Sequence, residues 1–276
     1  MIKNEIVRPQ NGYKMLVLDL DDTLLTDDYQ ISERNKTRLI QAQEKGVKVV
    51  LASGRPTPAM MRYARELQLD VYDSYMVSFN GAVVTSLKNN QNIFETALTI
   101  AEIQSLYDYS RSKNVHIITY SQQGVVSETF SEYIDVELGL TGIPHHKVDS
   151  FKAEVSYKAA KCILLEHPDY LKMVEIDLKQ LRPDLSVARS KPFFLEVMPK
   201  GIDKAASIER LAQLLNISRE EVIAVGNAGN DLSMVRYAGL GVWVDNVDPD
   251  LRHEADLIVS SNNNDGVAEV VERFIL

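Results

Sequence analysis

Three apolar runs of this sequence each end in a cluster of polar residues. The clusters are Asp19 with Asp21, Ser53 with Gly54, and Asn227 with Asn230 and Asp231. In an open parallel sheet the carboxyl ends of neighbouring strands share one edge, and ligands bind there. We therefore expect the clusters to converge, although the sequence separates them widely. Each cluster alone is also typical of a turn or a helix N-cap, so it is their joint occurrence that favours a functional site.

Two carboxylates at alternate positions after a strand need a counter-charge. Asp19 and Asp21 offer oxygen ligands, which Mg²⁺ prefers. A carboxylate held near a metal and a phosphate can attack phosphorus and form an aspartyl-phosphate. The second carboxylate can protonate the leaving alcohol and later take a proton from water. Ser53, the N–H of Gly54 and a lysine would stabilise the charge on the phosphoryl oxygens.

Short apolar runs without alternation predict strands that are buried on both faces. These runs are 15–18, 47–52, 74–79, 222–225, 241–244 and 257–259. Helices are predicted between them, over 33–45, 57–67, 204–215, from the third cluster to about 237, and 266–274. Ser32 is expected to cap the first of these helices and Gly46 to end it. The alternation predicts a doubly wound, mainly parallel α/β sheet.

The middle of the chain has another order of elements. Between 84 and 195 we expect strand, helix, two strands, helix, strand, helix and two strands, which indicates an α+β unit inserted into the α/β core. The predicted core is 1–83 and 196–276, and the predicted insert is 84–195. Two domains suit a chain of 276 residues at about 150 residues per domain.

Four motifs in this order resemble those of the haloacid dehalogenase (HAD) superfamily. They are Asp19-Leu20-Asp21-Asp22-Thr23 for DxDxT, Ser53-Gly54 for the second motif, Lys200 to Lys204 for the lysine motif, and Gly226 to Asp231 for GDxxND. Asn80-Gly81 before the insert and Asp265-Gly266 near the end are similar to the Cof-type phosphatases, which carry an inserted α+β cap of the C2 type. The resemblance spans essentially the whole chain.

The resemblance implies a role for each matching position. Asp19 would be the nucleophile and a Mg²⁺ ligand. Asp21 would be the general acid/base, with its backbone carbonyl on the metal, and Thr23 would orient the nucleophile loop. The groups implied to bind the phosphoryl group are the Leu20 N–H, Ser53, Gly54, the catalytic Lys204 and Asn230. Asn227 would complete the metal site, and Asp231 would hold a metal-bound water or orient the lysine.

The function expected from this resemblance is Mg²⁺-dependent hydrolysis of a small phosphorylated metabolite, such as a sugar phosphate or a phosphorylated cofactor. The cap would close over the site and select the leaving group. Two residues depart from the family pattern, since Asp22 replaces a common glycine and Asn227 replaces the usual aspartate. The lost charge at position 227 predicts weaker Mg²⁺ binding. The alternatives are a phosphomutase with the same core, a metabolite-binding regulator weakened by Asn227, and a receiver-type signalling domain.

Composition limits the partners. The net charge of −9 disfavours DNA, RNA and anionic membranes, and no apolar run approaches the roughly 20 residues of a membrane helix. Cys162 is the single cysteine, which excludes an internal disulfide and a cysteine zinc site and suits a reducing compartment. We expect a cytoplasmic monomer or homodimer that acts on a small molecule.

Several other polar residues have more ordinary interpretations. The adjacent His145 and His146 would point to opposite faces of an extended segment, so a solvated loop is expected rather than a metal site. His116 lies on a predicted strand of the insert and is a weaker candidate for contact with substrate. Arg55 is expected to be a surface or supporting group, and Glu196 to form a structural ion pair.

Overall fold

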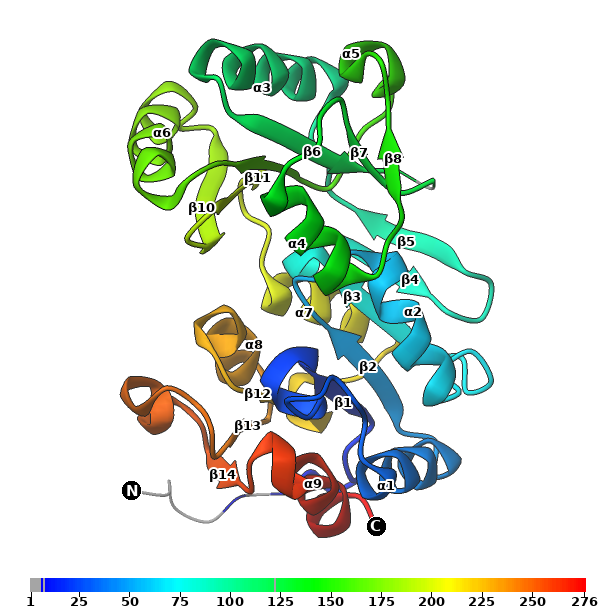
Figure 1. The fold of residues 1–276 in the computed structure, drawn as a ribbon. Coiled ribbons are helices and arrows are strands. Elements are labelled where there is room, and N and C mark those ends of the chain that lie inside the picture. Colours follow the sequence, from blue (N-terminus) through cyan, green and yellow to red (C-terminus); the bar gives the residue numbers. More distant parts are fainter. Residues whose placement is uncertain (1–5, 7, 122) are drawn as a thin grey trace. The chain divides into compact units, whose positions relative to one another are not determined.

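The computed structural model describes residues 6, 8–121 and 123–276, and the chain divides into two compact units (Figure 1). The first unit runs to Phe94 and resumes with Asp203–Leu276, whereas the second is the continuous segment Glu95–Ile202. The inserted unit is therefore a single stretch of sequence, and the unit that surrounds it is built from both ends of the chain.

The first unit contains a sheet in which eight strands are described, in the order β14-β13-β12-β1-β2-β3-β4-β5. Their bounds are β1 (Met15–Leu18), β2 (Lys48–Ala52), β3 (Tyr75–Ser78), β4 (Val83–Ser86), β5 (Gln91–Glu95), β12 (Val222–Gly226), β13 (Leu240–Val244) and β14 (Leu257–Val259). The pairs from β14 to β3 are parallel, and β4 is antiparallel to β3. The predicted doubly wound, mainly parallel sheet is confirmed.

Helices cover both faces of this sheet. The helices α1 (Glu33–Glu44), α2 (Thr57–Glu66) and α9 (Gly266–Phe274) pack on one face. The helices α7 (Lys204–Leu214) and α8 (Leu232–Tyr237) pack on the other. Because β1 is buried between the two layers, its whole run Met15–Leu18 is apolar. Ser32 caps α1 as predicted, because its side chain accepts a hydrogen bond from the N–H of Asn35.

The second unit is an α+β structure with a sheet of six described strands in the order β10-β11-β9-β6-β7-β8. The strands are β6 (His116–Tyr120), β7 (Val125–Ser127), β8 (His145–Lys147), β9 (Cys162–Leu165), β10 (Leu185–Lys191) and β11 (Phe194–Pro199). The helices are α3 (Ile100–Lys113), α4 (Glu132–Thr141), α5 (Phe151–Glu154) and α6 (Pro168–Leu181). Side chains of α3, α5 and α6 pack with one face of this sheet in a common apolar core.

The bounds of the inserted unit differ from the expected 84–195. At the start, β4 pairs antiparallel with β3 and β5 follows β4 at the edge of the same sheet, so both strands extend the sheet of the first unit. At the end, β11 continues to Pro199 because it pairs with β10 over its whole length. Hydrogen bonding to a neighbouring strand thus moves the first boundary by about ten residues and the second by fewer.

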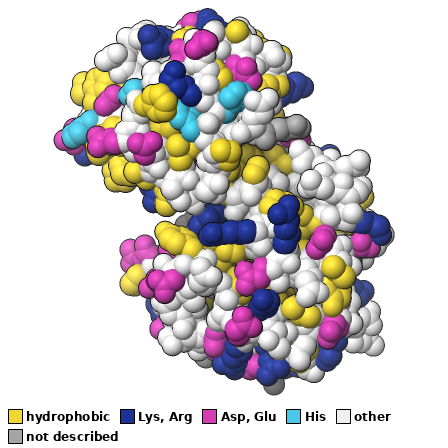
Figure 2. All heavy atoms as spheres, turned by 45° about the vertical axis from the view of Figure 1, so that its right-hand side comes forward, with side chains coloured by type: hydrophobic (Ala, Val, Ile, Leu, Met, Phe, Trp, Pro, Cys, Tyr) yellow, Lys and Arg dark blue, Asp and Glu magenta, His cyan; other side chains and the backbone are white. Residues whose placement is uncertain are grey.

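Within the described residues, no helix has the length and apolar character that would let it cross a bilayer. Acidic and basic side chains are intermixed on the face that Figure 2 shows.

Candidate active site

The ends of three neighbouring strands bring the predicted site residues to one edge of the sheet. Leu18 of β1 lies opposite Leu51 of β2 and Val225 of β12 in parallel register. The residues that follow these positions therefore leave the sheet at the same edge. This edge carries the DxDxT segment, the Ser53-Gly54 pair and the segment from Asn227 to Asp231, as predicted from the three polar clusters.

A buried charge cluster lies at this edge. The Nζ of Lys204, at the start of α7, donates to Oδ1 of Asp19 at 2.7 Å and to Oδ1 of Asp231 at 2.6 Å. It also donates to the carbonyl oxygen of Ala52 at 3.0 Å. The lysine side chain is fully buried, and so is that of Asp231. One ammonium group therefore joins the ends of β1, β2 and β12.

Burial and neighbouring charges change the pKa values of Asp19 and Lys204 in this cluster. Burial raises the pKa of the Asp19 carboxyl, Asp231 adds to that rise, and Lys204 opposes it. Burial alone would lower the pKa of Lys204, but the two carboxylates outweigh it and raise that pKa above its usual value. The lysine therefore stays charged, and a cation bound near Asp19 would favour the ionised form of that carboxyl.

The chain turns sharply after β1, in a single π-helical turn over Leu20–Leu24. The N–H of Leu25 donates to the carbonyl of Leu20 at 2.9 Å. Asp22 has φ 57° and ψ 14°, a left-handed conformation that Gly, Asn and Asp tolerate best. This geometry explains why aspartate can stand at a position where glycine is common. No described residue accepts a hydrogen bond from the N–H of Leu20, which starts the turn.

Asp21, whose side chain is 41% exposed, pairs with Arg55. The guanidinium donates from Nε to Oδ2 at 2.8 Å and from Nη2 to Oδ1 at 2.5 Å, which is a bidentate pair. The rings of Tyr29 and Tyr63 lie 5.5 Å and 5.8 Å from the guanidinium carbon. The sequence predicts that Arg55 is a surface or supporting group, but in the structure its guanidinium contacts the proposed site residue Asp21. Its position two residues after Ser53 was the available signal.

The loop after β2 presents the second motif. The Ser53 hydroxyl accepts a hydrogen bond from the N–H of Arg55 at 3.1 Å. Among the described residues, no group accepts from the N–H of Gly54. Asn230 lies exposed in the loop after β12, and its side chain makes no hydrogen bond with any described residue. The hydroxyl of Thr23 is buried and has no partner in the described part of the chain, so it does not orient the loop by a hydrogen bond.

Asp231 also fixes the loop that contains Asn227. Its Oδ2 accepts hydrogen bonds from the N–H of Asn227 at 3.0 Å and of Ala228 at 3.2 Å. Since its other oxygen contacts Lys204, Asp231 orients the lysine and the loop. These contacts correspond to one of its two expected roles, that of orienting the lysine. Gly226 is required here, because a Cβ at that position would lie 2.5 Å from the Cβ of Asp231.

A divalent cation fits the chemistry of the remaining donors. In the described residues, no three His, Cys, Asp or Glu side chains gather into a metal cluster. The expected set, however, includes the amide of Asn227 and the backbone carbonyl of Asp21, together with Asp19. Oδ2 of Asp19 receives no hydrogen bond from a described residue, whereas its Oδ1 is held by Lys204. An all-oxygen set with this unpaired carboxylate oxygen suits Mg²⁺.

The candidates of the second unit have local partners. His116 Nδ1 lies 2.8 Å from the hydroxyl of Thr129, and His145 Nε2 lies 2.7 Å from that of Ser127. Both histidines are thus engaged within the unit, and the adjacent His145 and His146 lie on β8 rather than in a loop. The structural ion pair expected for Glu196 is confirmed, since its Oε1 accepts from Lys161 at 2.8 Å.

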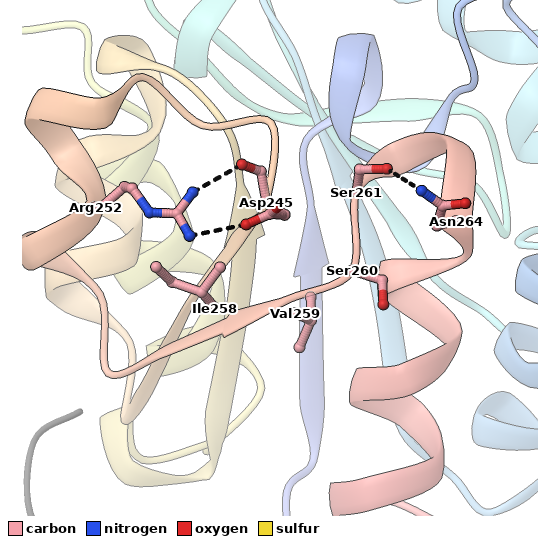
Figure 3. A pocket seen from close by; sticks show the side chains of 7 residues that line it. All are labelled: Asp245, Arg252, Ile258, Val259, Ser260, Ser261 and Asn264. Carbon is pink, nitrogen blue, oxygen red and sulfur yellow. Dashed lines mark hydrogen bonds and ion pairs between the residues drawn. The ribbon is translucent and has the colours of Figure 1, made fainter. Parts of the chain in front are cut away.

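A polar pocket of about 510 Å³ opens beyond β13 and β14. Figure 3 shows that Arg252 turns to Asp245, with Nη2 and Oδ1 2.8 Å apart, and that Asn264 donates to Ser261 at 2.9 Å. The hydroxyl of Ser260 donates to Glu269 at 3.1 Å. These groups already satisfy one another, so the pocket offers a ligand less than the ends of β1, β2 and β12 do.

Comparison with known proteins identifies the family. Residues 16–271 match the model of the haloacid dehalogenase-like hydrolases. The "Putative phosphatase YxeH" of Bacillus subtilis is 33% identical over 96% of this chain and 99% of its own. The chain therefore belongs to the haloacid dehalogenase-like hydrolases, and the resemblance seen in its motifs is confirmed.

Two further relatives cover nearly the same length. The "5-amino-6-(5-phospho-D-ribitylamino)uracil phosphatase YcsE" of B. subtilis is 28% identical over 98% of this chain and 99% of its own. The crystal structure of a haloacid dehalogenase-like hydrolase from Bacteroides thetaiotaomicron superposes with a TM-score of 0.91 and 37% identity, covering 95% of this chain and 99% of that one. The chain is thus an enzyme of this family, a hydrolase of phosphoric monoesters, which disfavours a purely regulatory role.

Proposed function

We propose that this enzyme is a Mg²⁺-dependent phosphatase that hydrolyses small phosphorylated metabolites through an aspartyl-phosphate on Asp19. The observation that carries the proposal is the buried cluster of Asp19, Lys204 and Asp231 at the strand ends. Beside it lie the unpaired N–H groups of Leu20 and Gly54, which are donors without acceptors in a site that would receive phosphoryl oxygens.

Asp19 would act as the nucleophile. Lys204 holds the carboxylate in place through Oδ1. A bond from one carboxylate oxygen to phosphorus would form as the ester bond from phosphorus to the leaving oxygen breaks, and the other carboxylate oxygen would remain for the cation. The N–H groups of Leu20 and Gly54 and the hydroxyl of Ser53 would stabilise the phosphoryl oxygens, and Asn230 would approach from the loop after β12. The charge of Lys204 is fixed before substrate arrives and needs no rearrangement.

Asp21 would move the proton. It would donate a proton to the leaving alcohol, and then take one from the water that attacks the aspartyl-phosphate, so that inorganic phosphate leaves and Asp19 is regenerated. Arg55 holds both oxygens of Asp21. Its guanidinium would set the direction of that carboxyl group and would release one oxygen for the proton transfer.

Asp19, the backbone carbonyl of Asp21 and Asn227 would hold the cation, and Asp231 would orient Lys204 and the loop that contains Asn227. When bound, Mg²⁺ offsets the negative charge that Asp19 and a phosphate bring together. Because Asn227 is neutral, the site carries one negative charge less than the family pattern, and we propose that it holds Mg²⁺ more weakly.

The substrate class we propose is a sugar phosphate, a sugar-alcohol phosphate or a phosphorylated cofactor. The relative named for a phosphoribitylamino-uracil supports the inclusion of phosphates of polyhydroxylated chains. The residues proposed to contact the phosphate all belong to the first unit, so they would serve many monoesters alike. Selection of the leaving group is then left to other residues, for which we propose the inserted unit.

The test is phosphate release from a panel of phosphorylated metabolites and from p-nitrophenyl phosphate, with and without Mg²⁺. Wild-type enzyme should release phosphate only with the metal, and Asp19→Asn should lose at least about a thousandfold in rate, because a neutral amide cannot form the intermediate. Equal rates for wild type and Asp19→Asn would overturn the proposal. Transfer of the phosphoryl group within a sugar phosphate, without free phosphate, would favour the phosphomutase instead.

A further inference from the structure

An unusual loop follows β3. Three consecutive residues have positive φ, namely Phe79 at 51°, Asn80 at 55° and Gly81 at 108°. Glycine adopts this region freely and asparagine tolerates it, but an aromatic residue enters it rarely. A conformation of this kind persists only where the surrounding structure determines it, and such positions gather at functional sites.

The surrounding contacts lie on two motifs of the proposed site. The N–H of Phe79 donates to the carbonyl of Arg55 at 3.0 Å, and the N–H of Asn80 donates to the carbonyl of Ser53 at 3.0 Å. On the other side, a Cβ on Gly81 would lie 2.5 Å from the carbonyl oxygen of Asp203, the residue before Lys204. The loop is therefore fixed between the second motif and the start of α7.

The side chain of Asn80 lies against Gly54 in this arrangement. A Cβ added to Gly54 would be 3.0 Å from Oδ1 and 3.2 Å from Nδ2 of Asn80. Oδ1 is buried without a hydrogen-bond partner in the described part of the chain, and no described residue accepts from Nδ2. An amide that is left unpaired in this way is costly. Asparagine tolerates positive φ, which explains why it can occupy this backbone position. That tolerance does not explain why its side-chain amide has no hydrogen-bond partner among the described residues.

We propose that Asn80 is a further substrate-binding residue, whose side-chain amide donates a hydrogen bond to an oxygen of the phosphoryl group held at Ser53 and Gly54. The inference rests on the proposed function and adds to it a residue outside the four motifs. Nδ2 is not among the buried unpaired side-chain atoms of the described residues, so the amide can present its N–H₂ to a phosphate without a rotation about χ2. A neutral donor there adds a hydrogen bond without disturbing the charge of the cluster around Lys204.

The test measures the affinity for inorganic phosphate, as product inhibition in Mg²⁺ buffer and as the concentration that protects against thermal unfolding. Asn80→Gly removes the amide and keeps positive φ without strain. We expect it to bind phosphate at least about fivefold more weakly, with an unchanged unfolding midpoint. Asn216→Gly is the matched control, because Asn216 has the same φ of 55° and lies exposed after α7; it should bind phosphate as the wild type does.

Wild-type affinity in Asn80→Gly would overturn the inference. Asn80→Asp keeps the shape and places a carboxylate near the phosphate, so it should weaken binding further and raise KM for p-nitrophenyl phosphate more than it lowers kcat. Equal affinity of Asn80→Asp and wild type would also overturn it. The wild-type protein gives an independent reading, since added phosphate should shift the side-chain amide resonances of Asn80 but not those of Asn216. Failure of the proposed function would appear in Asp19→Asn, whereas failure of this inference would appear at Asn80 alone.

Discussion

Replacing Lys204 by methionine tests the central cluster directly. The Lys204 side chain is fully buried, and its Nζ contacts Asp19, Asp231 and the carbonyl of Ala52. Methionine occupies a similar volume without a charge, so little packing is lost. The variant Lys204→Met would leave two carboxylates facing each other in a site with little access to water.

The expected loss follows from that burial. Removing one partner of a buried ion pair costs about 3–5 kcal/mol, because the other charge stays desolvated and unpaired. We expect Lys204→Met to lower the free energy of unfolding of the metal-free protein by this amount. Adding Asp19→Asn removes one of the two unpaired charges, so the double variant should recover about 1–3 kcal/mol of that loss as a coupling energy.

Urea unfolding, followed by the fluorescence of Trp243 in the presence of a metal chelator, would measure both effects. Trp243 is the single tryptophan of the chain and is buried in β13 of the same unit. Lys14→Met is the control, because Lys14 pairs with Glu221 at 2.6 Å but is 44% exposed, and such pairs contribute about 0–1 kcal/mol. If Lys204→Met loses no more stability than Lys14→Met, the reasoning about the buried cluster is refuted.

Three further predictions concern single sites. Asn227→Asp should lower the Mg²⁺ concentration that gives half-maximal phosphate release, because it adds a negative charge to the proposed metal site; an unchanged or higher concentration would contradict this. Burial raises the pKa of Glu137, so its ionisation opposes folding as pH rises through that pKa. Glu137→Gln should therefore lose less thermal stability than wild type between about pH 5 and about pH 8, and equal losses would count against it. Gly226→Ala places a Cβ 2.5 Å from the Cβ of Asp231 and should cost about 1–3 kcal/mol in urea unfolding, whereas Gly229→Ala, which meets open space, should cost less than half as much.

The sheet of the first unit was predictable because its strands are short, wholly apolar runs. Burial on both faces requires such runs, as β1 illustrates. The elements that were missed in the insert carry no such pattern. The strand β8 is the polar tripeptide His145–Lys147, and α5 spans only Phe151–Glu154, so neither is long enough to show a period. Strand β5 was missed because its residues are mostly exposed.

The site was predictable where a motif fixes residue types at short spacing, as in the segments that contain Asp19 and Asp231. The contact between Asp21 and Arg55 was not, because their 34-residue separation says nothing about side-chain direction. The position of Asn80 was equally hidden. Its sequence neighbour Gly81 indicates a turn, but only the backbone angles and the contact with Gly54 reveal that its amide lies beside the second motif.

The discontinuity of the first unit has a consequence for the order in which the protein is made. β1 lies between β2 and β12, and about 200 residues separate it from the latter, which translation at roughly 5–20 residues per second adds in roughly 10–40 s. During that interval the continuous segment Glu95–Ile202 leaves the ribosome complete. The inserted unit can therefore fold first. Until β12 is made, the apolar edge of β1 that pairs with it remains exposed. The incomplete chain would therefore need protection from aggregation at that edge before the active site is assembled.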